Sequence, residues 1–147
     1  MKLILTKSSL VFDRGATQIS QKYGNEIQGM TLHAYFNADG SEYNGSSSVV
    51  QGITPFIDIQ GLLSDIVITN SFANYTNPHP DVVFYASQNA ADIVGMHTEA
   101  DGGRFNPTIS KNSVPTNAKY MRVACNFGSS QPSSYQYATE VTFTKGN

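Results

Sequence analysis

The histidines are the first side chains to test for catalysis, because an imidazole can move protons at neutral pH. The chain of 147 residues has three of them, His33, His79 and His97. None stands in a His-Glu-x-x-His or His-x-His pattern, and no serine stands in Gly-x-Ser-x-Gly. The sequence therefore predicts surface or structural histidines, no enzyme activity and no cofactor.

The carboxylates offer one candidate metal loop. Residues 37–42 read Asn-Ala-Asp-Gly-Ser-Glu, which places oxygen ligands at alternate positions, as calcium loops do. The rest of a full calcium loop is missing, and Asp-Gly is also typical of a tight turn. We expect a hairpin turn and no metal site here, with a bound calcium ion as the alternative.

Aromatic side chains in polar loops suit sugar binding, because an exposed ring stacks on the apolar face of a pyranose. Tyr75 and Tyr135 lie in such loops, and we interpret them as candidate stacking platforms. His79 and Arg104 are the candidate polar partners for sugar hydroxyls. The chain has no Trp, and an aromatic residue on a strand is more often part of the core.

The composition argues against several partners. Charged residues make up 14% of the chain, the net charge is −2, and Lys and Arg form no cluster, so no nucleic acid is expected. The apolar run at residues 3–5 is too short for a signal peptide, and none approaches a membrane span. We therefore expect that the protein does not insert into a membrane and that it assembles in a cytoplasm. The single cysteine, Cys125, is predicted to be a buried core residue.

Short apolar runs alternate with polar turns along the chain, and no long window has a helical period. Abundant Gly, Ser, Asn and Thr suit short strands joined by turns. A single domain of this size buries enough surface to fold without a disulfide. The sequence predicts an all-β sandwich, with strands at residues 30–36, 53–59, 65–69, 81–85, 93–94, 115–125 and 137–144.

One stretch, residues 113–124, organises this expected fold. Pro115 fixes its own φ and extends the residue before it, and Asn117 suits a turn. From Ala118 onward apolar and charged side chains alternate, but the alternation slips at Tyr120 and Met121. A strand with such a slip is expected to be covered on both faces, as in the centre of a two-layer sandwich.

The chain has one plausible boundary. Residues 1–28 read as an N-terminal arm or hairpin, followed by a connection with at most one weak strand, and residues 29–147 read as the β-sandwich domain. The arm carries the apolar residues Leu3, Leu5, Leu10 and Phe12, which we interpret as candidate partner-binding residues.

Four motifs carry a resemblance to a known family. They are Phe56-Ile57-Asp58-Ile59, Val83-Phe84-Tyr85, Ile93-Val94-Gly95 and the Val-Pro-Thr-Asn-Ala-Lys-Tyr-Met-Arg-Val run at residues 114–123. Their order resembles an antiparallel, jelly-roll-like β-sandwich module, similar to carbohydrate-binding modules, that is found in bacteriophage virion proteins. Residues 5–12 also look like the start of structural proteins from crAss-like gut phages.

The resemblance implies a structural virion protein: a capsid decoration protein, or a head-fibre or tail accessory protein. Its expected location is the virion surface after assembly in the host cytoplasm. Its expected partners are major capsid, portal or tail proteins, and copies of itself, with a trimer favoured. The arm would anchor the protein and the sandwich would face outward. The alternative is a glycan-binding adhesin module that recognises a host-surface glycan.

Overall fold

The computed structural model describes residues 15–25, 27–44, 51–70, 79–98, 106–127 and 139–146. Within these ranges every strand pairing is antiparallel, and the helical content is one 3₁₀ turn, η2 (Lys111–Ser113). The prediction of an antiparallel all-β sandwich is therefore confirmed. The strands are β1 (Ala16–Tyr23), β2 (Thr31–Leu32), β3 (Ala34–Phe36), β4 (Glu42–Asn44), β5 (Gln51–Ile53), β6 (Ile57–Asp58), β7 (Ile66–Asn70), β8 (Val82–Tyr85), β9 (Ile93–His97), β10 (Thr108–Ile109), β11 (Tyr120–Asn126) and β12 (Thr139–Gly146).

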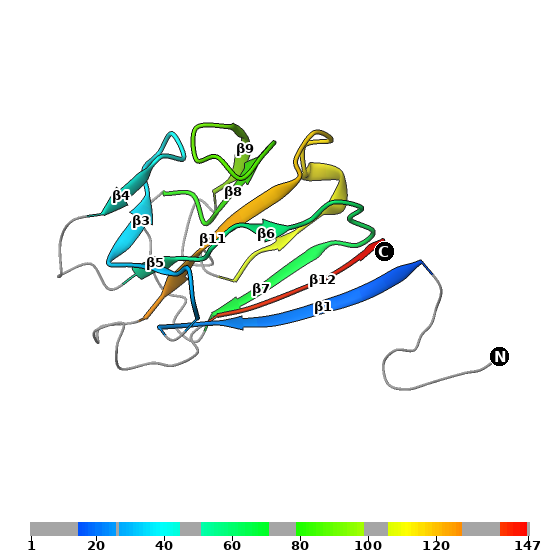
Figure 1. The fold of residues 1–147 in the computed structure, drawn as a ribbon, viewed down its shortest axis with the longest axis horizontal. Coiled ribbons are helices and arrows are strands. Elements are labelled where there is room, and N and C mark those ends of the chain that lie inside the picture. Colours follow the sequence, from blue (N-terminus) through cyan, green and yellow to red (C-terminus); the bar gives the residue numbers. More distant parts are fainter. Residues whose placement is uncertain are drawn as a thin grey trace.

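Two sheets form the layers of the sandwich (Figure 1). The first, called the β12 sheet, has four strands in the order β1-β12-β7-β10. The second, called the β11 sheet, has six strands in the order β2-β5-β11-β8-β9, with β6 also paired to β11. A separate hairpin, β3–β4, completes the described strands.

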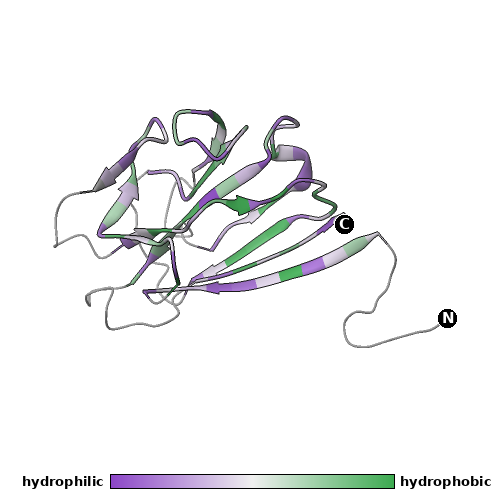
Figure 2. Cartoon of the chain, viewed as in Figure 1, coloured by the Kyte–Doolittle hydropathy of each residue, from purple (hydrophilic) through white to green (hydrophobic). Residues whose placement is uncertain are grey.

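The β12 sheet follows the two-residue period of a half-buried sheet. Ile66 and Ile68 of β7 and Val141 and Phe143 of β12 point into the core between the layers, while Val67 points to solvent. Figure 2 shows the apolar character of β7 and the mixed character of β1. The last strand, predicted at residues 137–144, is β12 (Thr139–Gly146), and residues 137–138 lie outside the described part of the chain.

Strand β1 is longer and more integrated than the sequence predicts for residues 15–28. All of its residues pair with β12, from Ala16 opposite Gly146 to Tyr23 opposite Thr139. Tyr23 is buried, and Ile19 packs against the same core. Most other β1 side chains are polar and exposed, so the strand shows little of the alternation that reveals a strand in sequence. The arm at residues 1–14 lies outside the described residues.

The central strand β11 is covered on both faces, as the slip at Tyr120 and Met121 predicts. Met121 and Val123 point into the core between the sheets, whereas Ala124 belongs to a second cluster on the outward face. That second cluster contains Phe36, which the β3–β4 hairpin lays over the β11 sheet with no exposed surface. The hairpin therefore forms a partial third layer.

Two predicted strands are interrupted by local backbone features. His33 has a φ of 58°, a left-handed conformation that splits residues 30–36 into β2 and β3. Pro55 lies between β5 and β6, where its missing N–H donor is tolerated. The buried Thr54 keeps this break attached to β11, because its N–H donates to the Val123 carbonyl at 3.0 Å and its hydroxyl accepts from the Val123 N–H at 3.0 Å.

Candidate functional site

Of the predicted site residues, His79 is the one that the described ranges include. The other glycan candidates, Tyr75, Arg104 and Tyr135, lie outside the described residues, as do the arm residues Leu3, Leu5, Leu10 and Phe12. His79 comes shortly before β8 and is half-buried. The surroundings of His79 are therefore the part of the predicted glycan site that the described residues include.

His79 packs on a pair of tyrosines from the hairpin. Its ring centroid lies 4.8 Å from that of Tyr35, with the planes tilted by 43°. Tyr35 in turn stacks on Tyr43 at 4.7 Å and 24°. We call these three residues the ring row. Tyr43 is 39% exposed, so the row ends at solvent.

The hairpin sets the geometry of the ring row. Tyr35 and Tyr43 are directly opposite each other in the β3–β4 register. Ala34 and Phe36, on either side of Tyr35, are buried in the outward cluster of the β11 sheet, so Tyr35 points to the other face of the hairpin. The sequence predicts the turn but does not single out these tyrosines as site residues. The signal that points to them is an aromatic residue on each side of an Asp-Gly turn.

The ring row suits a sugar more than a reactive substrate. Aromatic rings offer apolar faces for stacking, and tyrosine hydroxyls at their edges exchange hydrogen bonds with sugar hydroxyls. The row reaches solvent at Tyr43, which would leave the free side of that ring for a surface oligosaccharide.

The turn at residues 37–42 uses its own oxygen atoms. The Asp39 carboxylate accepts hydrogen bonds from the Ser41 N–H at 2.9 Å and the Ser41 hydroxyl at 2.6 Å. These hydrogen bonds lower the pKa of Asp39. Glu42 lies 3.4 Å from the Arg122 guanidinium instead of facing Asp39. In the described part of the chain, no group of three or more His, Cys, Asp or Glu side chains could hold a metal ion.

Arg122 is a buried structural cation beneath the hairpin. Its Nε donates to the Thr54 carbonyl at 2.9 Å, and its terminal nitrogens lie 3.4 Å from Glu42 Oε1 and from Thr31 Oγ1. Its guanidinium carbon is 5.2 Å from the centre of the Phe56 ring. One side chain thus joins β11 to β2, to β4 and to the link between β5 and β6.

The four motifs that carry the family resemblance lie side by side. Their strands β6, β11, β8 and β9 are consecutive neighbours in the β11 sheet. Phe56 meets Tyr85 edge-on at 4.9 Å. A Cβ on Gly95 would lie 2.7 Å from Pro115 Cγ, so a glycine is needed where the proline crosses β9. These motif residues hold the fold together, and Ile59, Val114, Pro115, Thr116 and Ala118 among them also line a pocket.

Two further groups that could do chemistry have structural settings. Cys125 is fully buried, which confirms its predicted place in the core, and burial raises the pKa of its thiol to about 12. His97 Nδ1 lies 2.8 Å from the Oδ1 atom of the buried Asp81, and the His97 carbonyl accepts from the Asp81 N–H at 2.9 Å. This pair ties the end of β9 to the start of β8.

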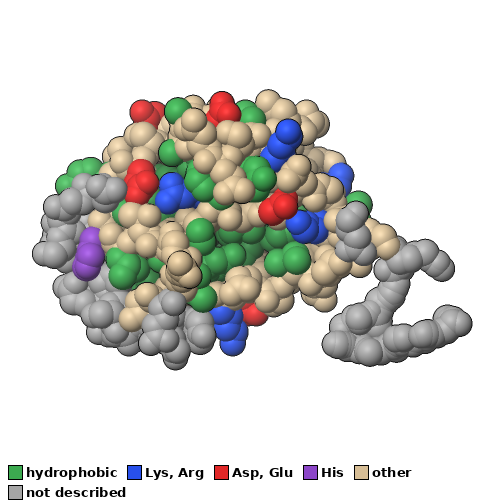
Figure 3. Space-filling model, in the orientation of Figure 1, with side chains coloured by type: hydrophobic (Ala, Val, Ile, Leu, Met, Phe, Trp, Pro, Cys, Tyr) green, Lys and Arg blue, Asp and Glu red, His purple; other side chains and the backbone are tan. Residues whose placement is uncertain are grey.

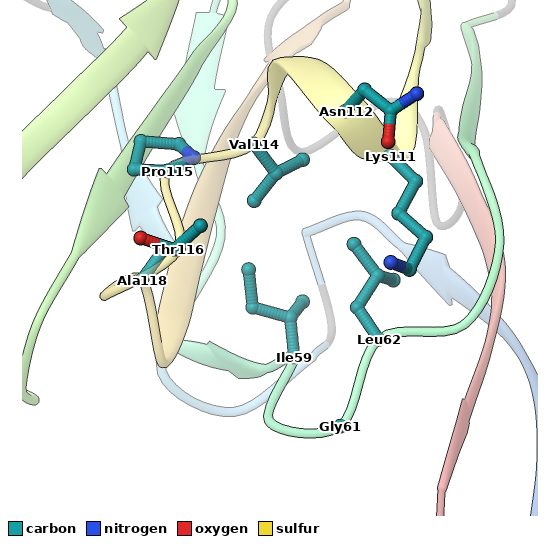
Figure 4. Close-up of a pocket in the computed structure, with 9 residues that line it drawn as sticks. All are labelled: Ile59, Gly61, Leu62, Lys111, Asn112, Val114, Pro115, Thr116 and Ala118. Atoms are coloured by element: carbon teal, nitrogen blue, oxygen red, sulfur yellow. The ribbon is translucent and has the colours of Figure 1, made fainter.

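A pocket of about 380 Å³ opens at one end of the sandwich (Figure 4). Ile59, Leu62 and Val114 point into it, and the rim is formed by Lys111 and Asn112 on one side and Pro115 and Thr116 on the other. The pocket belongs to the same turn, at residues 113–118, that the sequence marks as the organising stretch.

Lys, Arg, Asp and Glu are interspersed on the face shown in Figure 3, and apolar side chains gather near its centre, over the region between β6 and β7. The described residues include no helix long and apolar enough to cross a membrane.

No protein-family model, curated protein or solved structure matches the chain.

Proposed function

We propose that this chain is a structural protein of a bacteriophage particle, either a capsid decoration protein or a head-fibre component. Its N-terminal arm would anchor it to other virion proteins, and its β-sandwich would face outward. The observation that supports this proposal is the joint packing of the four resemblance motifs on β6, β11, β8 and β9. A protein whose resemblance motifs stabilise its fold suits a structural role.

The expected assembly follows from the same proposal. Major capsid, portal or tail proteins would bind the arm, and a trimer is the favoured oligomer. The protein would have no enzyme activity, would bind no nucleic acid and would not insert into a membrane. It would reside on the virion after assembly in the host cytoplasm. Cys125, with its pKa of about 12, offers no reactive thiol for catalysis.

The test is stoichiometric incorporation into particles. Quantitative mass spectrometry of purified virions should find this chain in a fixed ratio to the major capsid protein. Replacing Leu3 and Leu5 with serine should abolish incorporation and leave the far-ultraviolet β spectrum unchanged. Exchange of the exposed Leu63 for serine is the matched control, since it removes a leucine outside the arm. Virions that lack the wild-type chain would refute the proposal.

A glycan-binding role is the second candidate, and the ring row favours it. His79, predicted as a sugar-binding residue, stacks beside Tyr35 and the exposed Tyr43. Tyr43→Ala should weaken binding on a glycan array by about two- to tenfold, since a stacked ring is worth about 0.5–1.5 kcal/mol. Tyr43→Phe, which keeps the ring, should retain most of the affinity. A wild-type chain that binds no glycan on a broad array would exclude this role.

A further inference from the structure

Three glycines meet beside the pocket at the end of the sandwich. The Gly146 N–H donates to the Gly61 carbonyl at 2.7 Å. A Cβ on Gly146 would lie 3.6 Å from the Gly15 carbonyl oxygen and 3.6 Å from that of Gly61. Gly61 is itself a lining residue of the pocket. The described chain therefore starts, at Gly15, next to the pocket.

The backbone at Gly15 is suited to a reversal of direction. Its φ is +78°, a left-handed conformation that glycine adopts without strain, and it has open space around it. Residues 10–12, Leu-Val-Phe, precede it by only a few positions. Each extended residue spans at most about 3.3–3.6 Å, so Phe12 can lie within about 10 Å of Gly15.

The pocket is large enough for an aromatic side chain and has an apolar base. Its volume of about 380 Å³ is more than twice that of a cavity of about 150 Å³ that accepts benzene. Ile59 is almost fully buried at its base, and Leu62, Val114 and Ala118 pack against the inner core while facing the opening. An apolar group placed there would extend the core.

The rim of the pocket adds a charge match. Lys111 is exposed at the rim, and Asp13 directly follows Phe12 in sequence. A Phe12 side chain inside the pocket would place the Asp13 carboxylate near the mouth, where the Lys111 ammonium group is in reach. Exposed pairs of this kind contribute little affinity but favour one orientation.

We propose that this pocket is the docking site for the N-terminal arm of the same chain, with the Phe12 side chain as its occupant. The arm of the same chain is favoured over the arm of a second copy, because the short connection through Gly15 gives the arm a high effective concentration at the pocket. The proposal does not depend on a virion function. A docked arm would shield Phe12 from partners.

Disulfide trapping in the full-length chain tests this proposal. Val11→Cys, which keeps the Phe12 side chain, is combined with Thr116→Cys in one variant and with Leu62→Cys in another, because bridging requires Cα atoms within about 7 Å. A docked arm should give a disulfide at monomer mass in at least one variant after mild oxidation, located by peptide mapping. Val11→Cys with Thr69→Cys is the control, because Thr69 lies on the outward face of the β12 sheet.

The outcomes separate the occupants of the pocket. A disulfide-linked dimer would show that the arm of a second copy fills the pocket and would overturn the proposal. The absence of a disulfide above the control level in both variants would overturn it as well. The native Cys125 is buried and does not compete for oxidation.

Thiol labelling gives a second readout that needs no bridge. In the single variant Thr116→Cys, added Phe12→Ser should raise the labelling rate at least about tenfold, because it releases the arm from the rim. Added Leu3→Ser should leave the rate unchanged, since Leu3 is not the proposed occupant. Equal rates with and without Phe12→Ser would contradict docking, and unchanged circular dichroism would show that both variants are folded.

Discussion

The outward faces of the two sheets differ in what covers them. The β12 sheet leaves Val67 and Thr69 exposed and Thr142 half-buried, and within the described residues no further strand layer lies over it. The outward face of the β11 sheet holds Val83 and Tyr85, both buried under the β3–β4 hairpin. The covered sheet also supports the ring row through that hairpin. The comparison shows that the candidate sugar-binding surface depends on a core that the β12 sheet lacks.

The largest expected effect comes from uncovering the β11 sheet. Phe36→Ala removes a side chain with no exposed surface and should lower the free energy of unfolding by about 3–5 kcal/mol. Chemical denaturation monitored by circular dichroism measures it. Phe143→Ala, in the inner core of the β12 sheet, is the matched control and should cost a similar amount. A loss below about 1 kcal/mol for Phe36→Ala alone would mean that the hairpin is no part of the core.

A smaller effect is expected where β9 is crossed by the proline turn. Gly95→Ala places a Cβ 2.7 Å from Pro115 Cγ and should destabilise the protein by about 1–3 kcal/mol. Pro115→Ala in the same chain should recover part of that loss, with a coupling of at least about 0.5 kcal/mol in a double-mutant cycle. Additive effects would show that the contact does not constrain the β11 sheet.

Alkaline pH tests the β12 sheet through the buried Tyr23 of β1. Burial, together with the nearby Cys125, raises the pKa of Tyr23 in β1 to about 12, while an unfolded tyrosine ionises near 10. Since the unfolded chain loses this proton first, stability should fall as the pH rises from about 10 to about 12, by at most about 1–2 kcal/mol. Tyr23→Phe should reduce that decline in stability in denaturation curves taken across this pH range. A decline of the same sign that comes from Cys125 should remain in the variant. An unchanged decline would place Tyr23 outside the core.

The smallest effect is expected on the outward face of the β12 sheet. Thr142→Ala should change the free energy of unfolding by no more than about 0.5 kcal/mol, because the face is solvated. Thermal unfolding of this variant beside Phe36→Ala measures the contrast directly. A large loss would indicate that this face is covered in solution, for example by another copy.

Local sequence signals predict the elements whose side chains alternate clearly. The slip at Tyr120 and Met121 predicts the central strand covered on both faces, and the Asp39-Gly40 turn predicts the β3–β4 hairpin. Strand β1 escapes prediction as an integrated strand because its pairing with β12 supplies the order that its polar residues do not.

Contacts between distant segments explain what the sequence does not predict. The need for Gly95 arises from Pro115, twenty positions later, and becomes visible only when β9 and the turn are packed together. The ring row likewise joins the hairpin to His79 from a separate loop. Of the predicted glycan residues, His79 alone is described, so the site on Tyr75, Arg104 and Tyr135 stays a prediction.

The pairing of Ala16 with Gly146 brings the two ends of the described body to one pole of the molecule. Domains with adjacent ends tolerate grafting into a surface loop of a host protein. The body from residue 15 to residue 146 is therefore a natural insertion cassette. A tag or a fluorophore attached at either end would leave the ring row, which the hairpin carries, available for display.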